Sequence, residues 1–512
     1  MQLSFKRFVK LEQKSFLNLV AGLSYQIISI SMGLILPYLF ITNLGSESNG
    51  LLSSVGQVFT CLGLLEAGVS TATIQALYKP ISAKDKKNIN EILSATDFYY
   101  RKTGIWYIVT VSILIIVFPY LIDSELSTRT IRLVIALQGI GAVTTYFVQA
   151  KYNLFLRAEG KNYILSLIML VTLIVRNFGK IIAIWLGFNV VAVQIVHLSA
   201  IVLEAGIICF YIKSHYKWIN LKEKPDFEAI GQKSTVFVQS VAWMVFNHTD
   251  VLLLTVITRD LKIISVYSIY STVFETAQNI MNAARESFQY KIGRVAQQEE
   301  NKLDSFFEGY SLKILALSLI VFSSVYLISS PFISLYTRNV TDIDYLIAGV
   351  SELFFVYKLL YGIRSMNRQL IEANGHFRQT QRIAILEAVL NLTISIALVY
   401  RFGIRGVLAG TVISLIVSVS WYMLYLKKNV VKAAIIAQTK YLLMCCPIII
   451  GIILIGYFKL ISVSSWTGLI FSAGGIGILL LIAFGGVLNI AMRAICKTAL
   501  NNIKKEDEAR ED

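Results

Sequence analysis

The sequence has few charged residues and no long hydrophilic stretch. Asp, Glu, Lys and Arg make up 15% of its 512 residues, and 56% are hydrophobic, whereas soluble domains contain about 25% charged residues. The longest hydrophilic stretches lie near residues 79–103, 213–233, 291–311 and from 493 onward. None of them is long enough for a separate soluble domain, so a soluble globular fold is excluded.

Cysteines and catalytic motifs are also scarce. The five cysteines lie in or beside apolar segments without zinc-ligand spacing, and Cys445 and Cys446 are adjacent, which argues against a disulfide framework. The four histidines are scattered and show no metal spacing. The chain has no Walker loop, no G-x-S-x-G and no H-E-x-x-H. We therefore expect no enzymatic activity, no cofactor and no metal.

The chain is dominated by apolar segments that are long enough to cross a bilayer, which takes about 20 residues as a helix. These segments are 15–41, 51–78, 104–121, 133–150, 163–186, 190–212, 234–257, 264–290, 312–335, 345–363, 383–400, 404–426, 441–458 and 466–490. Open strands in lipid would leave backbone groups unpaired, so the segments must be helices. The sequence predicts an all-α integral membrane protein with about 14 transmembrane helices.

Basic residues follow the topology of these spans. Most of the 47 Lys and Arg residues lie in every second gap, beginning with the N-terminal arm of residues 1–14 and ending with the tail. This positive-inside pattern predicts a multi-pass protein with both termini in the cytoplasm. Because the positive charge lies in short loops at one membrane face, the net charge of +16 indicates contact with anionic lipids and not with nucleic acid.

The sequence contains an internal repeat: three short segments recur later in the chain, each at nearly the same distance in sequence from its first copy. Ile41-Thr42 matches Ile257-Thr258, Ala158-Glu159-Gly160-Lys161 matches Ala373-Asn374-Gly375-His376, and Gly187 matches Gly403. Six spans repeated as six more keep the same orientation, so the repeat is parallel. We expect an N-terminal lobe at 1–212, a cytoplasmic linker at 213–233, a C-terminal lobe at 234–428, two additional helices at 429–492 and a charged tail at 493–512.

The eighth span carries a polar stripe. Ser271, Glu275, Gln278, Asn282 and Arg285 recur at helical spacing along one face. Ionisable groups in a membrane are costly and are a functional hypothesis by default. The stripe indicates either a water-filled cavity or ion pairs and hydrogen bonds with neighbouring helices.

The other embedded basic residues lie in the tenth and fifth spans. Arg364 and Arg368 continue a face with Tyr357 and Tyr361, and Lys358 is adjacent. Lys358, nearer the middle of the membrane, is a candidate to bind an anion. Arg364 and Arg368 near the cytoplasmic end suit headgroup anchoring, with anion binding as the alternative. Arg176 and Lys180 are one turn apart in the fifth span, so they repel each other unless an anion, a carboxylate or water intervenes.

Embedded acidic residues suggest ion coupling. Glu66 lies in the second span, and Asp250 lies in the seventh on one face with Gln239, Trp243 and Phe246. With Glu275 they are candidates to carry H⁺ or Na⁺, because a desolvated carboxylate takes up a proton more readily. The other interpretation is a carboxyl group that is hydrogen-bonded to a nearby helix.

The second span and its following loop resemble a known family. Gly50-Leu51-Leu52-Ser53-Ser54, Leu64 to Ala72 (LLEAGVSTA) and Leu77-Tyr78-Lys79-Pro80 are similar to Wzx-type polysaccharide or O-antigen flippases of the multidrug/oligosaccharidyl-lipid/polysaccharide (MOP) exporter superfamily. The resemblance implies a MATE-like fold with a cavity formed by the first, second, seventh and eighth spans. It also implies a bacterial cytoplasmic membrane and a substrate of glycan linked through pyrophosphate to undecaprenol.

The resulting prediction is a flippase of lipid-linked oligosaccharide repeat units for O-antigen, capsule or exopolysaccharide, working by alternating access. The candidate substrate-binding residues are Arg285, Lys358, Arg176, Lys180, Arg364, Arg368, Gln278, Asn282 and Trp243. Expected partners are the lipid-linked glycan, membrane lipids, a coupling H⁺ or Na⁺, and the polysaccharide polymerase machinery. The alternatives are an ion-coupled multidrug exporter, a membrane glycan polymerase or acyltransferase, and a structural scaffold.

Overall fold

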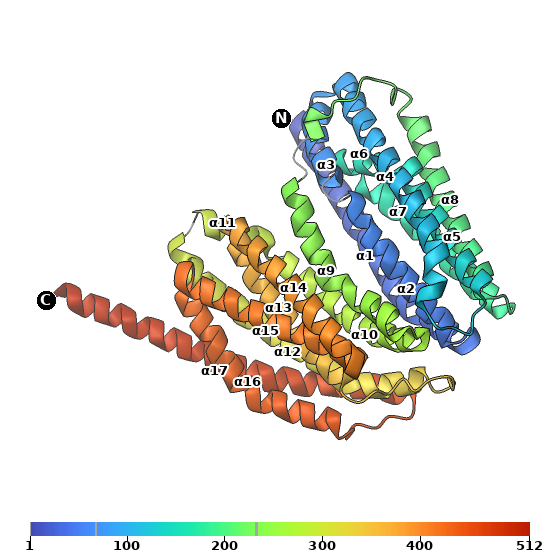
Figure 1. Ribbon diagram of the computed structural model, residues 1–512. Coiled ribbons are helices and arrows are strands. Elements are labelled where there is room, and N and C mark those ends of the chain that lie inside the picture. The colour runs from blue at the N-terminus through green and yellow to red at the C-terminus, as the bar shows by residue number, and fades with distance from the viewer. Residues whose placement is uncertain (1, 67–68, 231–233, 299, 512) are drawn as a thin grey trace. The chain divides into compact units, whose positions relative to one another are not determined.

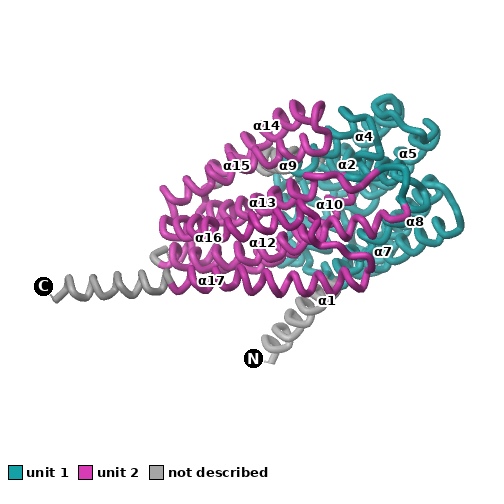
Figure 2. The backbone as a smooth tube through the Cα atoms, turned by 90° about the horizontal axis from the view of Figure 1, so that it is seen from below, with its two compact units in different colours: residues 1–266, 340–343 teal, residues 267–339, 344–512 magenta. Residues whose placement is uncertain are grey.

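The computed structural model describes residues 2–66, 69–230, 234–298 and 300–511, and these form helices and short connections (Figure 1). The described part contains no β-strand, only a single bridge between Asp123 and Asp260. Two compact units are distinguished (Figure 2). Unit 1 comprises 1–266 and 340–343, and unit 2 comprises 267–339 and 344–512.

Unit 1 contains the helices of the first half of the chain. In order they are α1 (Gln2–Asn43), α2 (Ser46–Leu62), η1 (Gly63–Glu66), α3 (Val69–Ala83), α4 (Lys86–Leu121), α5 (Thr128–Thr144), η2 (Thr145–Gln149), α6 (Ala150–Ala158), α7 (Asn162–Trp185), α8 (Val190–His215), η3 (Glu228–Ile230), α9 (Ser234–Thr258) and the first residues of α10 (Leu261–Glu286). Buried hydrophobic residues form the core of this unit, which also contains the buried ion pair between Lys151 and Asp97.

Unit 2 contains the rest of α10 and the remaining helices. These are α11 (Gln289–Gln298), α12 (Glu300–Tyr336), α13 (Val350–Ala373), α14 (Phe377–Phe402), α15 (Ile404–Asn429), α16 (Lys432–Tyr457) and α17 (Trp466–Glu511). Its core includes an aromatic group in which the rings of Tyr270 and Phe274 both stack on Phe354.

Each of the fourteen expected spans overlaps a described helix, as an all-α membrane fold requires. The tenth (345–363) starts before α13, which begins at Val350, and the eighth (264–290) runs past the end of α10 at Glu286. In the described part, ten helices are long and apolar enough to cross a bilayer by length and composition alone. The other four expected spans lie in α2–α3, α9, α10 and α13. Of these, α10 and α13 carry the polar and basic stripes, which lower the apolarity of those helices.

Two of the expected spans contain a helical segment that is not α-helical. The sequence predicts one helix over 51–78, but a 3₁₀ turn at Gly63–Glu66 separates α2 from α3. The span expected at 133–150 ends in the π-helical segment Thr145–Gln149. Such irregular turns inside membrane helices are found at binding sites, because the backbone there is free to contact cavities or ligands.

The helix bounds reproduce the internal repeat. The matching ends are Asn43 of α1 with Thr258 of α9 and Ala158 of α6 with Ala373 of α13, and the matching starts are Asn162 of α7 with Phe377 of α14. All three pairs have the same separation along the chain. The matched glycines, Gly160 with Gly375 and Gly187 with Gly403, all have positive φ. This conformation strains other residues, so each pair marks the same turn in both halves.

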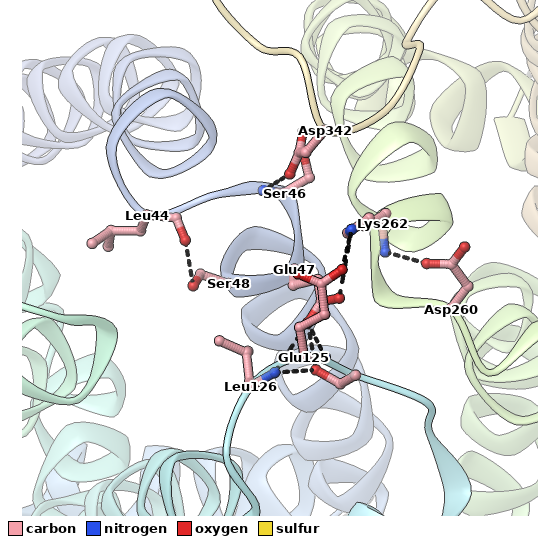
Figure 3. A network of polar contacts seen from close by, with 10 residues as sticks. Leu44, Ser46, Glu47, Ser48, Glu125, Leu126, Asp260, Lys262 and Asp342 are labelled. Atoms are coloured by element: carbon pink, nitrogen blue, oxygen red, sulfur yellow. Dashed lines mark hydrogen bonds and ion pairs between the residues drawn. The ribbon is translucent and has the colours of Figure 1, made fainter.

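Four connections of unit 1 form a polar network, which we call the loop cluster: residues 44–47, 122–127, 259–262 and 340–343 (Figure 3). The Glu47 carboxylate accepts hydrogen bonds from the Ser124 hydroxyl and from the backbone N–H groups of Glu125 (2.9 Å) and Leu126 (3.3 Å). Lys262 donates to the Glu125 carboxylate at 2.8 Å. This hydrogen bond raises the pKa of the Lys262 ammonium above its ordinary value.

The loop cluster contains a reciprocal pair of contacts. Ser46 donates from its backbone N–H (2.8 Å) and its hydroxyl (2.7 Å) to Asp342, while Lys262 donates to Glu125. Lys262 occupies the position in the second half of the repeat that Ser46 occupies in the first. Asp342 lies within two residues of the position equivalent to Glu125. The two halves of the repeat therefore each contribute one donor and one carboxylate to the same cluster.

Candidate functional site

Arg176 and Lys180 on α7 line one open cavity of about 380 Å³ in unit 1. We call it the basic pocket. Lys180 is only 9% exposed, and the neighbouring Asn177 and Asn49 are also buried. The lining residues come from α1, α2, α7 and α8, and they are Ser29, Met32, Gly33, Leu36, Pro37, Phe40, Asn49, Leu52, Ser53, Leu173, Arg176, Asn177, Lys180 and His197.

The basic pocket has an unbalanced charge. Its described lining includes an arginine and a lysine but no aspartate or glutamate. Glu204 on α8 interacts electrostatically with Arg176, yet it accepts a hydrogen bond from Thr172 at 3.1 Å and does not line the pocket. Two like charges one turn apart in a poorly solvated site favour an anion between them, and guanidinium and amide donors suit phosphate oxygens.

A second cavity of about 350 Å³ lies in the same unit, and we call it the tyrosine pocket. His197 lines both cavities. The other lining residues come from α2, α4, α5, η2 and α8, and they are Gly56, Phe59, Thr60, Tyr107, Gln138, Ala142, Thr145, Tyr146 and Ile201. This described lining has hydroxyl, amide and aromatic groups and no Lys, Arg, Asp or Glu.

The polar stripe expected on the eighth span forms a hydrogen-bonded row on α10. Ser271 donates to Glu275 at 2.9 Å, Gln278 donates to Asn282 at 3.0 Å, and Arg285 donates to Asn282. Gln278 and Arg285 are buried, whereas Glu275 is exposed. The Arg285 Nη1 atom is buried without a hydrogen-bond partner in the described structure, so this guanidinium retains capacity to donate.

The basic residues of α13 have local partners. Arg364 forms an ion pair with Glu387 of α14 at 2.8 Å, and both side chains are buried. Arg368 pairs with Glu372 at 2.7 Å on its own helix. Lys358 is buried with its ammonium 4.5 Å from the centre of the Tyr357 ring. Arg364 is therefore neutralised within unit 2 rather than placed at a lipid headgroup.

Two candidate ion-coupling acids, Glu66 and Asp250, lie on η1 and α9 of unit 1. Glu66 ends the 3₁₀ turn η1 and interacts electrostatically with Arg157. Asp250 is buried on α9. The side chain of Trp243 lies outside the described residues. In the described part, no group of three or more His, Cys, Asp or Glu side chains could hold a metal ion.

Sequence reasoning identified the two cations of the basic pocket but not its polar neighbours. Asn49, Ser53, Gly56 and Thr60 recur at spacings of four, three and four residues, which places them on one face of α2. The first two line the basic pocket and the last two line the tyrosine pocket. This spacing was the available signal, and the isolated His197 gave none.

Comparison with known proteins identifies solved structures that share this fold. No family model matches the chain, and no curated protein sequence matches it. A solved structure titled "Inward-facing conformation of a multidrug resistance MATE family transporter of the MOP superfamily" matches with a TM-score of 0.64 and 16% identity, covering 79% of this chain and 96% of that one. "Lipid II flippase MurJ, inward closed conformation" matches with a TM-score of 0.64 and 16% identity, covering 93% and 99%.

These matches cover most of both chains, and the identity is low, so they establish the architecture. The apolar helices of the described part are long enough to cross a bilayer, and the helix bounds repeat at a constant offset. The chain is therefore an all-α, multi-pass integral membrane protein with the fold of the MATE and MurJ transporters of the MOP superfamily.

Proposed function

We propose that this chain is a flippase for an anionic lipid-linked glycan, with undecaprenyl pyrophosphate as the lipid carrier and surface polysaccharide as the destination. The observation that carries the proposal is the basic pocket, in which Arg176 and Lys180 meet without a lining carboxylate. A pyrophosphate cannot cross hydrocarbon unaided, because burying its charge without compensation is costly. Paired cations beside asparagine amides compensate that charge.

Further support comes from unit 2, which has an embedded basic residue of its own. Arg285 is buried with one nitrogen free to donate. In this proposal the lobes alternate access to the two membrane faces, and Arg285 and Lys358 contribute to holding the anion during transit. Glu66 and Asp250 carry the coupling H⁺ or Na⁺, and the membrane is the bacterial cytoplasmic membrane with both termini on its inner side.

The second candidate is an ion-coupled multidrug exporter. It is favoured by the likeness to a multidrug resistance MATE family transporter and by the embedded carboxylates Glu66 and Asp250. Cationic drugs would be repelled by the basic pocket, however. Drug resistance on overexpression, without accumulation of lipid-linked glycan on deletion, would establish this alternative instead.

The first prediction tests the basic pocket in cells. In a strain that depends on this chain for its surface polysaccharide, we expect Arg176→Gln with Lys180→Met to reduce export at least tenfold and to cause lipid-linked glycan to accumulate. The control is Lys313→Met, an exposed lysine of α12 that lines neither pocket. Normal export by the double variant, at matched membrane levels, would refute the proposed role of the pocket.

A further inference from the structure

The tyrosine pocket has the features of a binding site, although the proposed pyrophosphate is bound in the basic pocket. Its volume of about 350 Å³ falls within the roughly 300–1,000 Å³ of small-molecule sites. Two of its lining residues, Gln138 and His197, each have a polar atom (Oε1 and Nδ1) that is buried without a hydrogen-bond partner in the described structure. Buried polar atoms without a partner are destabilising, so the presence of these two atoms needs an explanation.

The wall of this pocket is shaped by an irregular helix. Thr145 and Tyr146 belong to the π-helical segment Thr145–Gln149, and such segments recur at functional sites. The Tyr107 ring lies 5.8 Å from Phe59 and 5.1 Å from Tyr146, measured between ring centroids. The pocket therefore combines an aromatic wall with uncharged hydrogen-bonding groups.

The two pockets follow each other along α2. Asn49 and Ser53 line the basic pocket, and Gly56 and Thr60 line the tyrosine pocket on the same helix face. At 1.5 Å per residue, the two lining segments are about 10 Å apart along the helix axis. His197 forms part of both walls, so one elongated molecule can place a charged end in one pocket and an uncharged part in the other.

We propose that the tyrosine pocket binds an uncharged sugar of the glycan whose pyrophosphate occupies the basic pocket. Sugar hydroxyls donate to Gln138 Oε1 and exchange hydrogen bonds with His197, and the ring packs against the aromatic wall. The absence of charged side chains from the described lining selects a neutral group over a second phosphate. This inference rests on the proposed function and adds that the glycan itself, beyond its carrier, is recognised inside unit 1.

The test compares two probes on the purified full chain. One is undecaprenyl pyrophosphate, and the other is the lipid-linked glycan extracted from cells that lack this chain. We expect the wild type to bind the glycan-bearing lipid at least tenfold more tightly than the bare lipid. Gln138→Leu should abolish that preference while leaving affinity for undecaprenyl pyrophosphate within twofold of wild type.

Gln194→Leu is the matched control. Gln194 is a buried glutamine of α8 that also has an unpartnered Oε1 atom in the described structure, and it lines neither pocket. Its replacement should leave both affinities unchanged, and Gln138→Asn should restore part of the preference. A preference that survives Gln138→Leu, or one lost equally in Gln194→Leu, overturns the sugar site. If neither lipid binds the wild type, or Arg176→Gln weakens neither, the proposed function itself fails.

Discussion

At the scale of single residues, the embedded charges fall into two kinds. Arg364 and Glu387 neutralise each other in the interior of unit 2, whereas Arg176 and Lys180 share a pocket that has no lining carboxylate in the described structure. The first arrangement needs no ligand. The second leaves two like charges close together in a poorly solvated pocket, with Glu204 interacting with Arg176 from outside the lining.

The second prediction concerns the Arg364–Glu387 pair. Glu387→Gln leaves a buried guanidinium without its counter-ion, and we expect the free energy of unfolding to fall by about 3–5 kcal/mol. The double change Arg364→Met with Glu387→Leu removes both charges and should recover most of that loss. Thermal unfolding of the detergent-solubilised protein measures both effects.

Glu372→Gln provides the comparison for that experiment. Its partner Arg368 is 18% exposed and Glu372 is 27% exposed at the side chain, so water partly replaces the lost interaction. We expect a change of about 1 kcal/mol or less. If Glu387→Gln and Glu372→Gln lower the free energy of unfolding equally, burial adds nothing to the stability that the Arg364–Glu387 pair contributes.

At the scale of helices, α14 and α15 pack through small residues. Gly406, Gly410, Ser414 and Ser418 are buried at four-residue spacing on α15. A Cβ atom at Gly406 would lie 2.4 Å from the Leu398 carbonyl oxygen of α14. Small residues at this spacing let backbones approach closely, which is a common basis of helix association in membranes.

The third prediction follows from this packing. Gly406→Ala should force α14 and α15 apart and lower the free energy of unfolding by about 1–3 kcal/mol. Gly451→Ala on α16 is the control, because a Cβ atom there meets nothing within 4 Å. The measurement is the fraction of protein that remains folded and soluble after heating in detergent. Equal heat resistance of both variants would contradict the close α14–α15 contact.

The sequence predicted the helices well but not their contacts. Apolar length fixes a membrane helix, so the ten described helices that are long and apolar enough to cross a bilayer were visible, and the glycine pairs revealed the repeat. The breaks at Gly63–Glu66 and Thr145–Gln149 were missed because both segments continue an apolar run. Spacing places residues on a face without saying what that face meets. For this reason the pairing of Arg364 with Glu387 and the role of His197 in two pockets became visible only in the structure.

At the scale of the whole chain, the loop cluster brings together four connections that are far apart in the sequence (Figure 3). Glu47 alone contacts three groups of the 122–127 connection. A carboxylate that accepts several hydrogen bonds, two of them from backbone N–H groups, holds a loop more firmly than a surface ion pair does. The order of the 122–127 connection therefore depends on a residue that lies far earlier in the chain.

The fourth prediction measures that dependence. Glu47→Ala should speed hydrogen exchange at the Glu125 amide roughly tenfold or more, because hydrogen bonds to charged groups contribute about 1.5–3 kcal/mol. The Leu126 amide should respond less, because it also donates to the Ser124 hydroxyl at 3.1 Å. Ser48→Ala is the control, since the Ser48 hydroxyl donates only to the Leu44 carbonyl at 2.8 Å. Mass spectrometry of peptides covering 122–128 measures the exchange rate in both variants. Unchanged exchange in Glu47→Ala would mean that the loop holds its shape without the carboxylate.

The reciprocal contacts of the loop cluster also bear on how the chain arose. Two identical polypeptides related by a twofold axis make every cross-contact twice. Here the contact occurs twice with altered residues: a serine donates to an aspartate in one copy, and a lysine donates to a glutamate in the other. A half-length ancestor that paired with itself accounts for both.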